Sequence, residues 1–371
     1  MIFYGRQNLD QSDKQAVIKV LDSSWLTQGP TVERFETGLA KKVAARYAVV
    51  VSSGTAALHL AYLVAGLGFG DEVITTPNTF VATTNMLLAV GAKPVFCDIR
   101  LDTYNIDESK IEQLITPRTR AIVPVHFAGH PCEMKIINKI AKKYNLGVIE
   151  DACHALGAIY QKQPIGSLSD LTIFSFHPVK AITTGEGGAI VTNNKIYYER
   201  LKLLRSHGVI KDQRGFNAMT MLGYNYRLTD IQAALGISQL RKLPSFIKKR
   251  HQVIDWYERE LSRVNEIILP TEQPGNYAGW HLYVIRVKNP RQRLSLMSWL
   301  REHNIGVNFH YPAVYSHPYY QQTGYDKIKL PNAEIYHESA LTLPLHTKLT
   351  KKEVDYIVRM IGRFFNSPTK V

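Results

Sequence analysis

From residue 47 onward, the chain repeats one pattern: a short run of β-branched or aromatic residues, a polar or glycine turn, and a segment with helical periodicity. This alternation is typical of βαβ units and predicts an α/β fold with a mixed, mostly parallel sheet flanked by helices. The expected strands are 47–52, 72–76, 93–97, 120–125 and 147–149, and the expected helices are 56–66 and 81–90. Two more strands, 171–176 and 188–192, are expected to be neighbours joined by a long loop rich in functional groups. We expect the chemistry in that loop.

The second half of the chain has a different pattern. It is helical from about residue 228 to 264, and we expect Pro244 to break this helix. A smaller α+β pattern follows, with expected strands near Ile267 and over 282–287 and expected helices from about Arg291 and Thr350. Since 371 residues suffice for about two domains, we predict a large domain over 1–245 and a small C-terminal α+β domain over 246–371.

The composition is that of an ordinary globular protein. Apolar residues make up 45% and charged residues 20% of the chain, and no run approaches the ~18–20 apolar residues of a membrane span. Arg6 and Asp10 interrupt the start of the chain before the apolar core of a signal peptide could form. Cys97, Cys132 and Cys153 are odd in number and include no CxxC pair, so we interpret them as reduced thiols and expect no metal site. The expected location is the cytoplasm.

The formal net charge of +14 favours an anionic partner. Nucleic acid, an acidic membrane surface and a phosphorylated small molecule all fit this charge. The basic residues are spread along the chain, without basic–aromatic interleaving or a recognised nucleic-acid module. The first half has neither a G-x-G-x-x-G turn nor a P-loop, which disfavours a dinucleotide fold and an ATPase. We expect no nucleic acid and no membrane among the partners.

An acidic residue follows the expected strand 147–149. Ligands bind beyond the carboxyl ends of the strands in parallel α/β sheets, so the carboxylate of Asp151 is placed where it can face a bound group. The alternative is that Asp151 only caps a turn or a helix. His154, three residues later, could pack in the core or contact a ligand.

A lysine lies in the long loop after the expected strand 171–176. Lys180 has apolar neighbours in a glycine-rich segment, where partial desolvation favours the neutral amine of Schiff-base chemistry, although a lone lysine could also be exposed. The turn at residues 52–57 opens a helix and offers hydroxyls, free backbone N–H groups and a positive dipole end, all suited to phosphate. With Asp151 as partner of a pyridinium nitrogen, these features meet the three requirements of pyridoxal phosphate (PLP).

Taken together, these motifs resemble the DegT/DnrJ/EryC1/StrS family of sugar aminotransferases. The resemblance covers nearly the whole chain, and the combination of motifs is highly specific. It rests on residues 25–30, 52–57, 77–80, 150–154, 175–180, 185–188, 225–227 and 310–312. It implies the PLP-dependent transferase fold of type I and active sites at a homodimer interface. A histidine in place of Lys180 would instead mark the dehydratase branch of the family.

The resemblance also implies roles for individual residues. Lys180 would form the Schiff base with PLP and move the proton between substrate and cofactor, and Asp151 would pair with the ring nitrogen. Phe80 would stack on the ring, although it could otherwise pack in a core. The other expected cofactor-binding residues are Thr55, Ala56, His154, Ser175 and Asn225, of which Asn225 would reach the site of the neighbouring subunit. The expected substrate-binding residues are Tyr4, Trp25, Leu26, Thr27, Ser53, Ser175, Asn225, His310, Tyr311, Pro312 and Ala313.

The activity implied by the resemblance is ping-pong transfer of an amino group from glutamate to a nucleotide-linked sugar. Residues 174–180 and 317–320 are most similar to those of members that aminate a UDP-linked 4-keto-6-deoxy sugar for pseudaminic acid or a related surface glycan. One alternative is a 3-keto sugar aminotransferase of the same family. Another is a non-catalytic protein that binds PLP or a nucleotide sugar, which the intact Lys180 and Asp151 disfavour.

Overall fold

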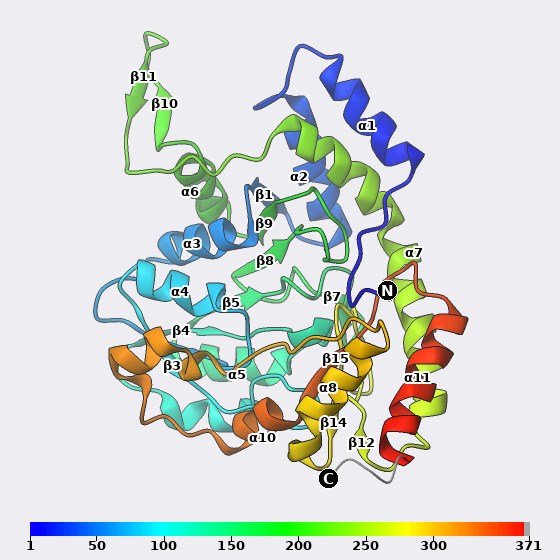
Figure 1. The fold of residues 1–371 in the computed structure, drawn as a ribbon. Helices are drawn as coiled ribbons and strands as arrows, with labels where there is room; N and C mark the ends of the chain where they lie inside the picture. The colour runs from blue at the N-terminus through cyan, green and yellow to red at the C-terminus, as the bar shows by residue number, and fades with distance from the viewer. Residues whose placement is uncertain (367–371) are drawn as a thin grey trace.

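The computed structural model describes residues 1–366 and is built around a seven-stranded sheet (Figure 1). The strand order is β1-β9-β8-β5-β4-β2-β3. Strand β9 runs antiparallel to both of its neighbours, and the other strands pair in parallel. The expected mixed, mostly parallel α/β sheet is therefore confirmed. Its strands are β1 (Tyr47–Val51), β2 (Glu72–Thr75), β3 (Lys93–Phe96), β4 (Thr119–Val123), β5 (Gly147–Asp151), β8 (Leu171–Ser175) and β9 (Gly188–Thr192).

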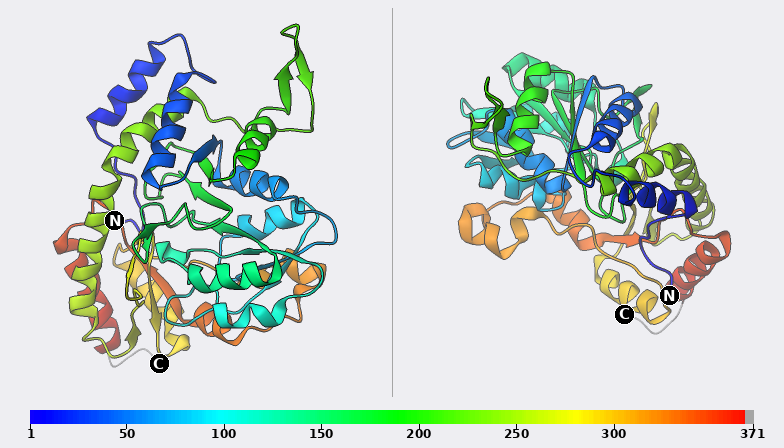
Figure 2. Two further views of the ribbon diagram at one scale, coloured as in Figure 1. Left: turned by 180° about the vertical axis from the view of Figure 1, so that it is seen from behind. Right: turned by 90° about the horizontal axis from the view of Figure 1, so that it is seen from above.

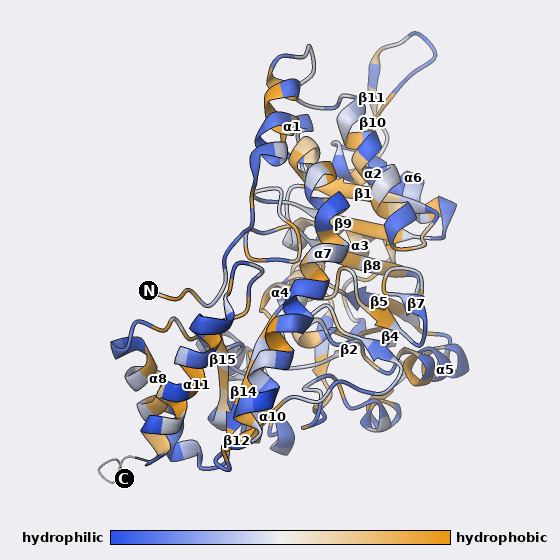
Figure 3. Ribbon diagram, turned by 90° about the vertical axis from the view of Figure 1, so that its right-hand side faces the viewer, coloured by the Kyte–Doolittle hydropathy of each residue, from blue (hydrophilic) through white to orange (hydrophobic). Residues whose placement is uncertain are grey.

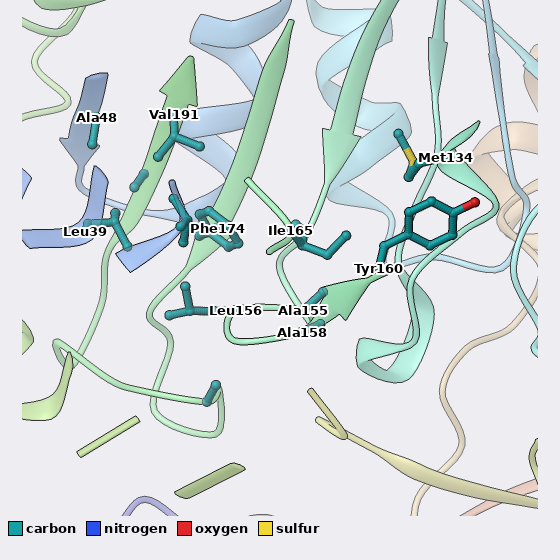
Figure 4. Packing of buried hydrophobic residues seen from close by; sticks show 14 of the residues in the cluster. Leu39, Ala48, Met134, Ala155, Leu156, Ala158, Tyr160, Ile165, Phe174 and Val191 are labelled. Atoms are coloured by element: carbon teal, nitrogen blue, oxygen red, sulfur yellow. The ribbon is translucent and has the colours of Figure 1, made fainter. Parts of the chain in front are cut away.

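Helices cover both faces of this sheet because successive side chains of a strand point to opposite faces. Ala48 and Val50 of β1 belong to one buried cluster, and Val49 and Val51 belong to a second cluster on the other face. Figure 4 shows part of the first cluster, with Ala48 and Phe174 packed on the same sheet. Burial on both faces explains the unbroken apolar run of β1. The helices are α2 (Pro30–Lys42), α3 (Gly54–Val64), α4 (Ala82–Ala89), α5 (Met134–Tyr144) and α6 (Lys195–Arg205).

One long helix, α7 (Asp230–Leu261), runs from the large sheet to the C-terminal part of the chain (Figure 1). The expectation that Pro244 breaks this helix is wrong. A proline removes one helical N–H hydrogen bond, but Leu243 and Ile247 are buried on either side of Pro244, and their packing keeps the helix continuous. The expected boundary between residues 245 and 246 lies inside α7 and remains a proposal. It is supported by the buried residues from Val253 onward, which belong to a separate cluster.

The C-terminal part has its own three-stranded antiparallel sheet, β12-β14-β15. Its strands and helices are β12 (Ile267–Ile268), β14 (Tyr283–Val287), β15 (Ala340–Leu343), α8 (Arg293–Glu302), α9 (Pro318–Tyr320), α10 (Pro331–Ser339) and α11 (Lys351–Asn366). The expected α+β pattern of this part is thus confirmed. The start of the chain also joins it, since Ile2 bridges to Ile305 and the Tyr4 carbonyl accepts the Leu345 N–H at 3.0 Å. The chain then enters α1 (Gln11–Leu21), which packs along α7 (Figure 2).

Two hairpins complete the fold. Strands β6 (Ile159–Tyr160) and β7 (Gln163–Pro164) pair with each other, and β13 (Asn276–Tyr277) joins β6. Strands β10 (Val209–Lys211) and β11 (Asn217–Met219) form a hairpin that projects away from the body of the molecule (Figures 1 and 2).

Apolar residues concentrate in the strands of the sheets, and polar residues lie on the outer helices (Figure 3). Within residues 1–366, no helix is long and apolar enough to cross a membrane.

Candidate active site

A cavity of about 650 Å³ lies at the carboxyl ends of β5 and β8, beside the start of α3. Ligands of α/β folds bind at this edge of a parallel sheet. The cavity brings together most of the residues that the sequence predicts for the site. Those that line it are Tyr4, Ser53, Thr55, Phe80, Asp151, His154, Ser175, Lys180, His310 and Tyr311.

The first turn of α3 contributes to one wall. Ser53 is the N-cap of this helix, and its Oγ accepts the N–H of Ala56 at 3.0 Å. The N–H groups of Gly54 and Thr55 belong to the same turn, where backbone donors lack partners within the helix and the helix dipole adds positive potential. A Cβ on Gly54 would lie 3.1 Å from Ser175 Cβ, so glycine suits this close approach of α3 to β8. The turn can therefore hold a phosphate, although a contact at the Ala56 N–H would compete with Ser53.

Asp151 is the last residue of β5, and its side chain is held from two directions. The Thr83 hydroxyl donates to Oδ2 at 2.7 Å, and the Cys153 backbone N–H donates to Oδ1 at 3.1 Å. Asp151 is only 5% exposed, so these bonds are shielded from water. Each carboxylate oxygen keeps further lone pairs. The arrangement fixes the carboxylate while leaving it able to accept a bond from a cationic ligand nitrogen.

Lys180 lies in the loop between β8 and β9. The neck of this loop is closed by two backbone bonds, from Phe176 N–H to the Gly187 carbonyl at 2.8 Å and from Thr184 N–H to the Phe176 carbonyl at 3.0 Å. Burial lowers the pKa of the Lys180 ammonium, while Cys153 and Asp151 act in the opposite direction. The lower pKa enlarges the neutral fraction of the amine, which is the form that attacks an aldehyde.

Histidines and aromatic rings form another part of the wall. His154 Nε2 lies 3.3 Å from the Tyr311 hydroxyl, and its ring is 4.4 Å from that of His281. Burial, assisted by the Lys180 charge, keeps the pKa of both histidines well below the usual range and lowers the pKa of His310 to about 4. These rings are therefore neutral at pH 7. Phe80 is 55% exposed, and its ring centroid is 5.8 Å from that of Tyr311. The exposed Phe80 ring can therefore stack on one face of a flat ligand in the cavity.

Several residues of the cavity were not predicted from the sequence. Thr83, Cys153 and His281 line it, and the sequence assigns no role to His177 and Glu186, whose Nε2 and Oε1 atoms lie 4.0 Å apart in the same wall. Cys153 and Thr83 could have been found, because one lies between two candidate residues and the other starts a helix just after Phe80. The position of His281 depends on the C-terminal part of the chain and has no local signal.

Seven of the predicted residues lie outside the lining of this cavity. One of them, Ala56, is buried in the first turn of α3. Trp25, Leu26, Thr27 and Asn225 are exposed. Trp25 lines a different hollow of about 920 Å³ between α1, α2 and α7. The segments that carry these residues are nevertheless close to each other, since Thr27 bridges to Thr229 and Leu26 accepts the Asp230 N–H at 2.9 Å. Leu26 and Thr27 therefore lie beside the start of α7, whereas Asn225 pairs with Ser206, which follows α6.

Pro312 and Ala313 also lie outside the described lining of the cavity. Ala313 is 5% exposed and packs in a cluster with Phe96, Tyr315 and Tyr320. Pro312 is half-buried next to it. The buried side chain of Ala313 is not available to a substrate, so a contact at this position would be made by its backbone.

The residues of the cavity fit PLP. An amine of lowered pKa, a carboxylate with spare lone pairs, the N-terminal turn of α3 and an exposed phenyl face match its aldehyde, ring nitrogen, phosphate and ring. Lys180, Asp151, Thr55 with Ser175, and Phe80 would hold these groups in that order. Because Gly54 has no side chain, α3 can approach Ser175 closely at the place where the phosphate would bind.

Comparison with protein families gives one match over most of the chain. Residues 7–362 match the model of the DegT/DnrJ/EryC1/StrS aminotransferase family. Among curated proteins, the UDP-4-amino-4,6-dideoxy-N-acetyl-beta-L-altrosamine transaminase of Campylobacter jejuni is 41% identical over 363 residues, which is 96% of each chain.

Solved structures also match over nearly the whole chain. Helicobacter pylori PseC, an aminotransferase involved in the biosynthesis of pseudoaminic acid, matches with a TM-score of 0.94 and 36% identity over 98% of this chain and 99% of that one. The PLP form of the putative sugar aminotransferase Spr1654 from Streptococcus pneumoniae matches with a TM-score of 0.93 and 32% identity over 98% of each chain.

Proposed function

The chain belongs to the DegT/DnrJ/EryC1/StrS aminotransferase family and is a PLP-dependent sugar aminotransferase, and we propose that it converts a UDP-linked 4-keto-6-deoxy sugar to the 4-amino sugar with glutamate as donor. The observation that carries this proposal is the cavity at the carboxyl ends of β5 and β8. It combines a lysine of lowered pKa with a fixed carboxylate and the open N-terminus of α3. The product would serve pseudaminic acid or a related surface glycan.

Bound PLP supplies an electron sink for the bonds around the transferred nitrogen. Asp151 keeps the ring nitrogen protonated, because its anionic carboxylate is fixed by Thr83 and has lone pairs to spare. Lys180 carries the proton between the substrate carbon and the site of the aldehyde. The neutral histidines around it add no competing charge, since burial keeps His154 and His281 unprotonated.

The choice of sugar rests on the relatives. The Campylobacter jejuni relative is named for a UDP-linked 4-amino-4,6-dideoxy sugar. The match to this relative covers 96% of both proteins at 41% identity, which supports a substrate of the same class. Amination at carbon 3 is the alternative, because a keto group one carbon away differs little in chemistry.

We also propose a homodimer with shared sites. Of the described residues that line the cavity, Lys180 is the only lysine and none is an arginine. Glutamate has two carboxylates and a nucleotide diphosphate has a charged pyrophosphate, so we propose that a second chain supplies further cations or donors to hold them. Asn225 is exposed and lies outside the cavity of its own chain, so it can face the cavity of a partner.

The hairpin β10–β11 supports the same arrangement. It projects from the body of the chain just before Asn225 (Figure 1). Phe216, Met219 and Leu222 in and after this hairpin are 66%, 67% and 70% exposed, which is an unusual amount of apolar surface unless another chain covers it. We place the enzyme in the cytoplasm, where its three free thiols would stay reduced.

An isotope experiment tests the proposed reaction. The purified protein is incubated with PLP, glutamate labelled with ¹⁵N at the amino group, and either a UDP-linked 4-keto-6-deoxy or a 3-keto-6-deoxy sugar. We expect ¹⁵N at carbon 4 of the first sugar, detected by NMR, and release of 2-oxoglutarate. Label at carbon 3 only would move the activity to the alternative, and label on neither sugar would overturn the proposed substrate class.

A further inference from the structure

Behind Asp151, on the opposite face of β5, two fully buried residues form a pair that the reaction above does not use. His126 Nε2 lies 2.7 Å from Glu150 Oε2, and both side chains are 0% exposed. Glu150 directly precedes Asp151 in the strand, so the two carboxylates point to opposite faces of the sheet. Burial of a carboxylate destabilises the fold unless several donors satisfy it, so the surroundings of Glu150 show how this pair is held.

The hydrogen bonds of His126 define its proton. The Cys132 backbone N–H donates to His126 Nδ1 at 2.9 Å, so this nitrogen carries no proton. The proton of the neutral ring is then on Nε2, from which it is donated to Glu150. The ring is thus held at both nitrogens and has one orientation.

Glu150 is held just as firmly. Its Oε1 accepts the hydroxyls of Thr172 at 3.0 Å and Ser169 at 2.5 Å. Thr172 belongs to β8, and His126 follows β4, so the carboxylate ties β5 to the segments on both of its sides. This network cross-links the sheet at the edge where the cavity lies.

The backbone of the same segment holds Asp151. The His126 N–H donates to the Asp151 carbonyl at 3.1 Å, and the Asp151 N–H donates to the Pro124 carbonyl at 2.9 Å. Val125, which lies between Pro124 and His126 in the chain, lines the cavity. A movement of the His126 ring would therefore move both backbone partners of Asp151.

We propose that the His126–Glu150 pair is a positioning element that holds the end of β5, so that the Asp151 carboxylate keeps its place in the cavity. This proposal rests on the proposed role of Asp151 toward the ring nitrogen. His126 and Glu150 touch neither substrate nor cofactor, and they act through the backbone of residues 124–126.

Two variants of His126 separate positioning from mere stability. In His126→Leu, both bonds of the ring are lost, whereas in His126→Gln the side-chain amide can still donate to Glu150. Glu72→Leu is the matched control. Glu72 is a buried carboxylate of the same sheet, 5% exposed, and it accepts bonds from Thr116 and Arg118 away from the cavity.

The first measurement uses the cofactor-free protein. Amide hydrogen exchange at residue 126 reports on its bond to the Asp151 carbonyl, and exchange at residue 151 reports on its bond to the Pro124 carbonyl. ¹⁵N NMR of the His126 ring reports its proton. We expect the Nε2–H form in the wild type. We expect His126→Leu to speed exchange at 126 and 151 about tenfold more than Glu72→Leu does, and His126→Gln to restore most of the protection. Equal exchange in His126→Leu and Glu72→Leu would overturn the proposal.

The second measurement uses the PLP-loaded enzyme. Because a shift of about 1 Å in a catalytic group can lower a rate ~10²-fold, we expect kcat to fall 10–100-fold in His126→Leu with KM for the sugar within about twofold. The pH titration of the cofactor absorbance should change as well, and His126→Gln should recover both. A kcat and a titration equal to those of Glu72→Leu would overturn the proposal. If Asp151→Asn itself left turnover unchanged, the role of Asp151 would fail, and the exchange experiment would still test the positioning of β5.

Discussion

The Thr83 hydroxyl donates a 2.7 Å hydrogen bond to Asp151 Oδ2 and thereby joins the first turn of α4 to the end of β5. The Cys153 N–H holds the second oxygen. Both donors are neutral, so the carboxylate keeps its full negative charge for a cationic partner in the cavity. Two roles are consistent with this arrangement: the carboxylate serves a ligand in the cavity, or it only caps the turn that follows β5.

Replacement of Asp151 by asparagine tests that distinction. The size of the side chain hardly changes, but the anion that keeps the ring nitrogen protonated is lost, so we expect kcat to fall by ~10²-fold or more. A helix cap would predict a loss of about 1 kcal/mol or less in the free energy of unfolding with turnover intact, because asparagine caps as well as aspartate. Turnover and urea unfolding of the same preparations decide between the two.

Thr83→Val removes the hydroxyl while keeping the shape of the side chain. Asp151 Oδ2 would lose this donor, and we expect kcat to fall about 10–150-fold, in keeping with the ~1.5–3 kcal/mol of a hydrogen bond to a charged group. Thr83→Ser should restore the rate. Thr84→Val is the control, because Thr84 is buried next to Thr83 but does not line the cavity among the described residues. A Thr83→Val enzyme as active as Thr84→Val would show that Thr83 does not hold Asp151.

Acid should destabilise the protein through its buried histidines. Burial lowers the pKa of His130 from 6.5 to about 4, and its Nε2 accepts the Gln273 N–H at 2.9 Å. As the pH falls below 6.5, the unfolded chain binds a proton that the folded protein does not bind, so the free energy of unfolding decreases until the pH reaches about 4.

We expect this single histidine to account for ~2 kcal/mol of the stability lost between pH 7 and pH 5. Urea unfolding at both pH values, in the wild type and in His130→Gln, measures the difference. The variant should lose less stability than the wild type over this interval. Equal losses in the two proteins would mean that His130 is not kept neutral by the fold.

Much of the site could be predicted because the strands and the positions where they end follow from local sequence patterns. Asp151, Ser175 and the turn after β1 each follow an apolar run, and in a parallel sheet the carboxyl ends of such runs meet at one edge. Lys180 is in the loop after Ser175, so it had to lie near the same edge. The β-branched runs likewise placed the strands of the large sheet.

Other features depend on contacts between distant segments. The role of Thr83 depends on where α4 packs against β5, and His281 reaches the cavity from beyond α7. The expected break at Pro244 was wrong because it followed local propensity alone, whereas the buried residues on both sides of Pro244 hold α7 together. Trp25 and Asn225 lie outside the cavity, and only the family resemblance, not a local sequence pattern, assigns Asn225 to the site of a neighbouring subunit.

The shared-site proposal is tested by mixing two inactive chains. Lys180→Ala and Asn225→Ala homodimers should both be inactive or badly impaired. In a mixed dimer, one site receives both defects, and the other combines an intact Lys180 with an intact Asn225 from the partner. We expect the purified heterodimer to show about half of the wild-type activity per dimer.

The control for this experiment is a heterodimer of Lys180→Ala with the wild-type chain, which shows that one site works alone. If the double-variant heterodimer, with confirmed mixing and bound cofactor, is no more active than its parents, Asn225 does not act in the partner's site.

The most direct test is of Lys180 itself. We expect the purified protein to absorb visible light through bound PLP and borohydride to fix the cofactor to a single peptide, which mass spectrometry would identify as the one that contains Lys180. Lys180→Ala should retain some PLP through the phosphate and ring contacts but lose the adduct and all transamination. A reduced adduct on another lysine, or preserved turnover in Lys180→Ala, would contradict the assignment of this cavity as the active site.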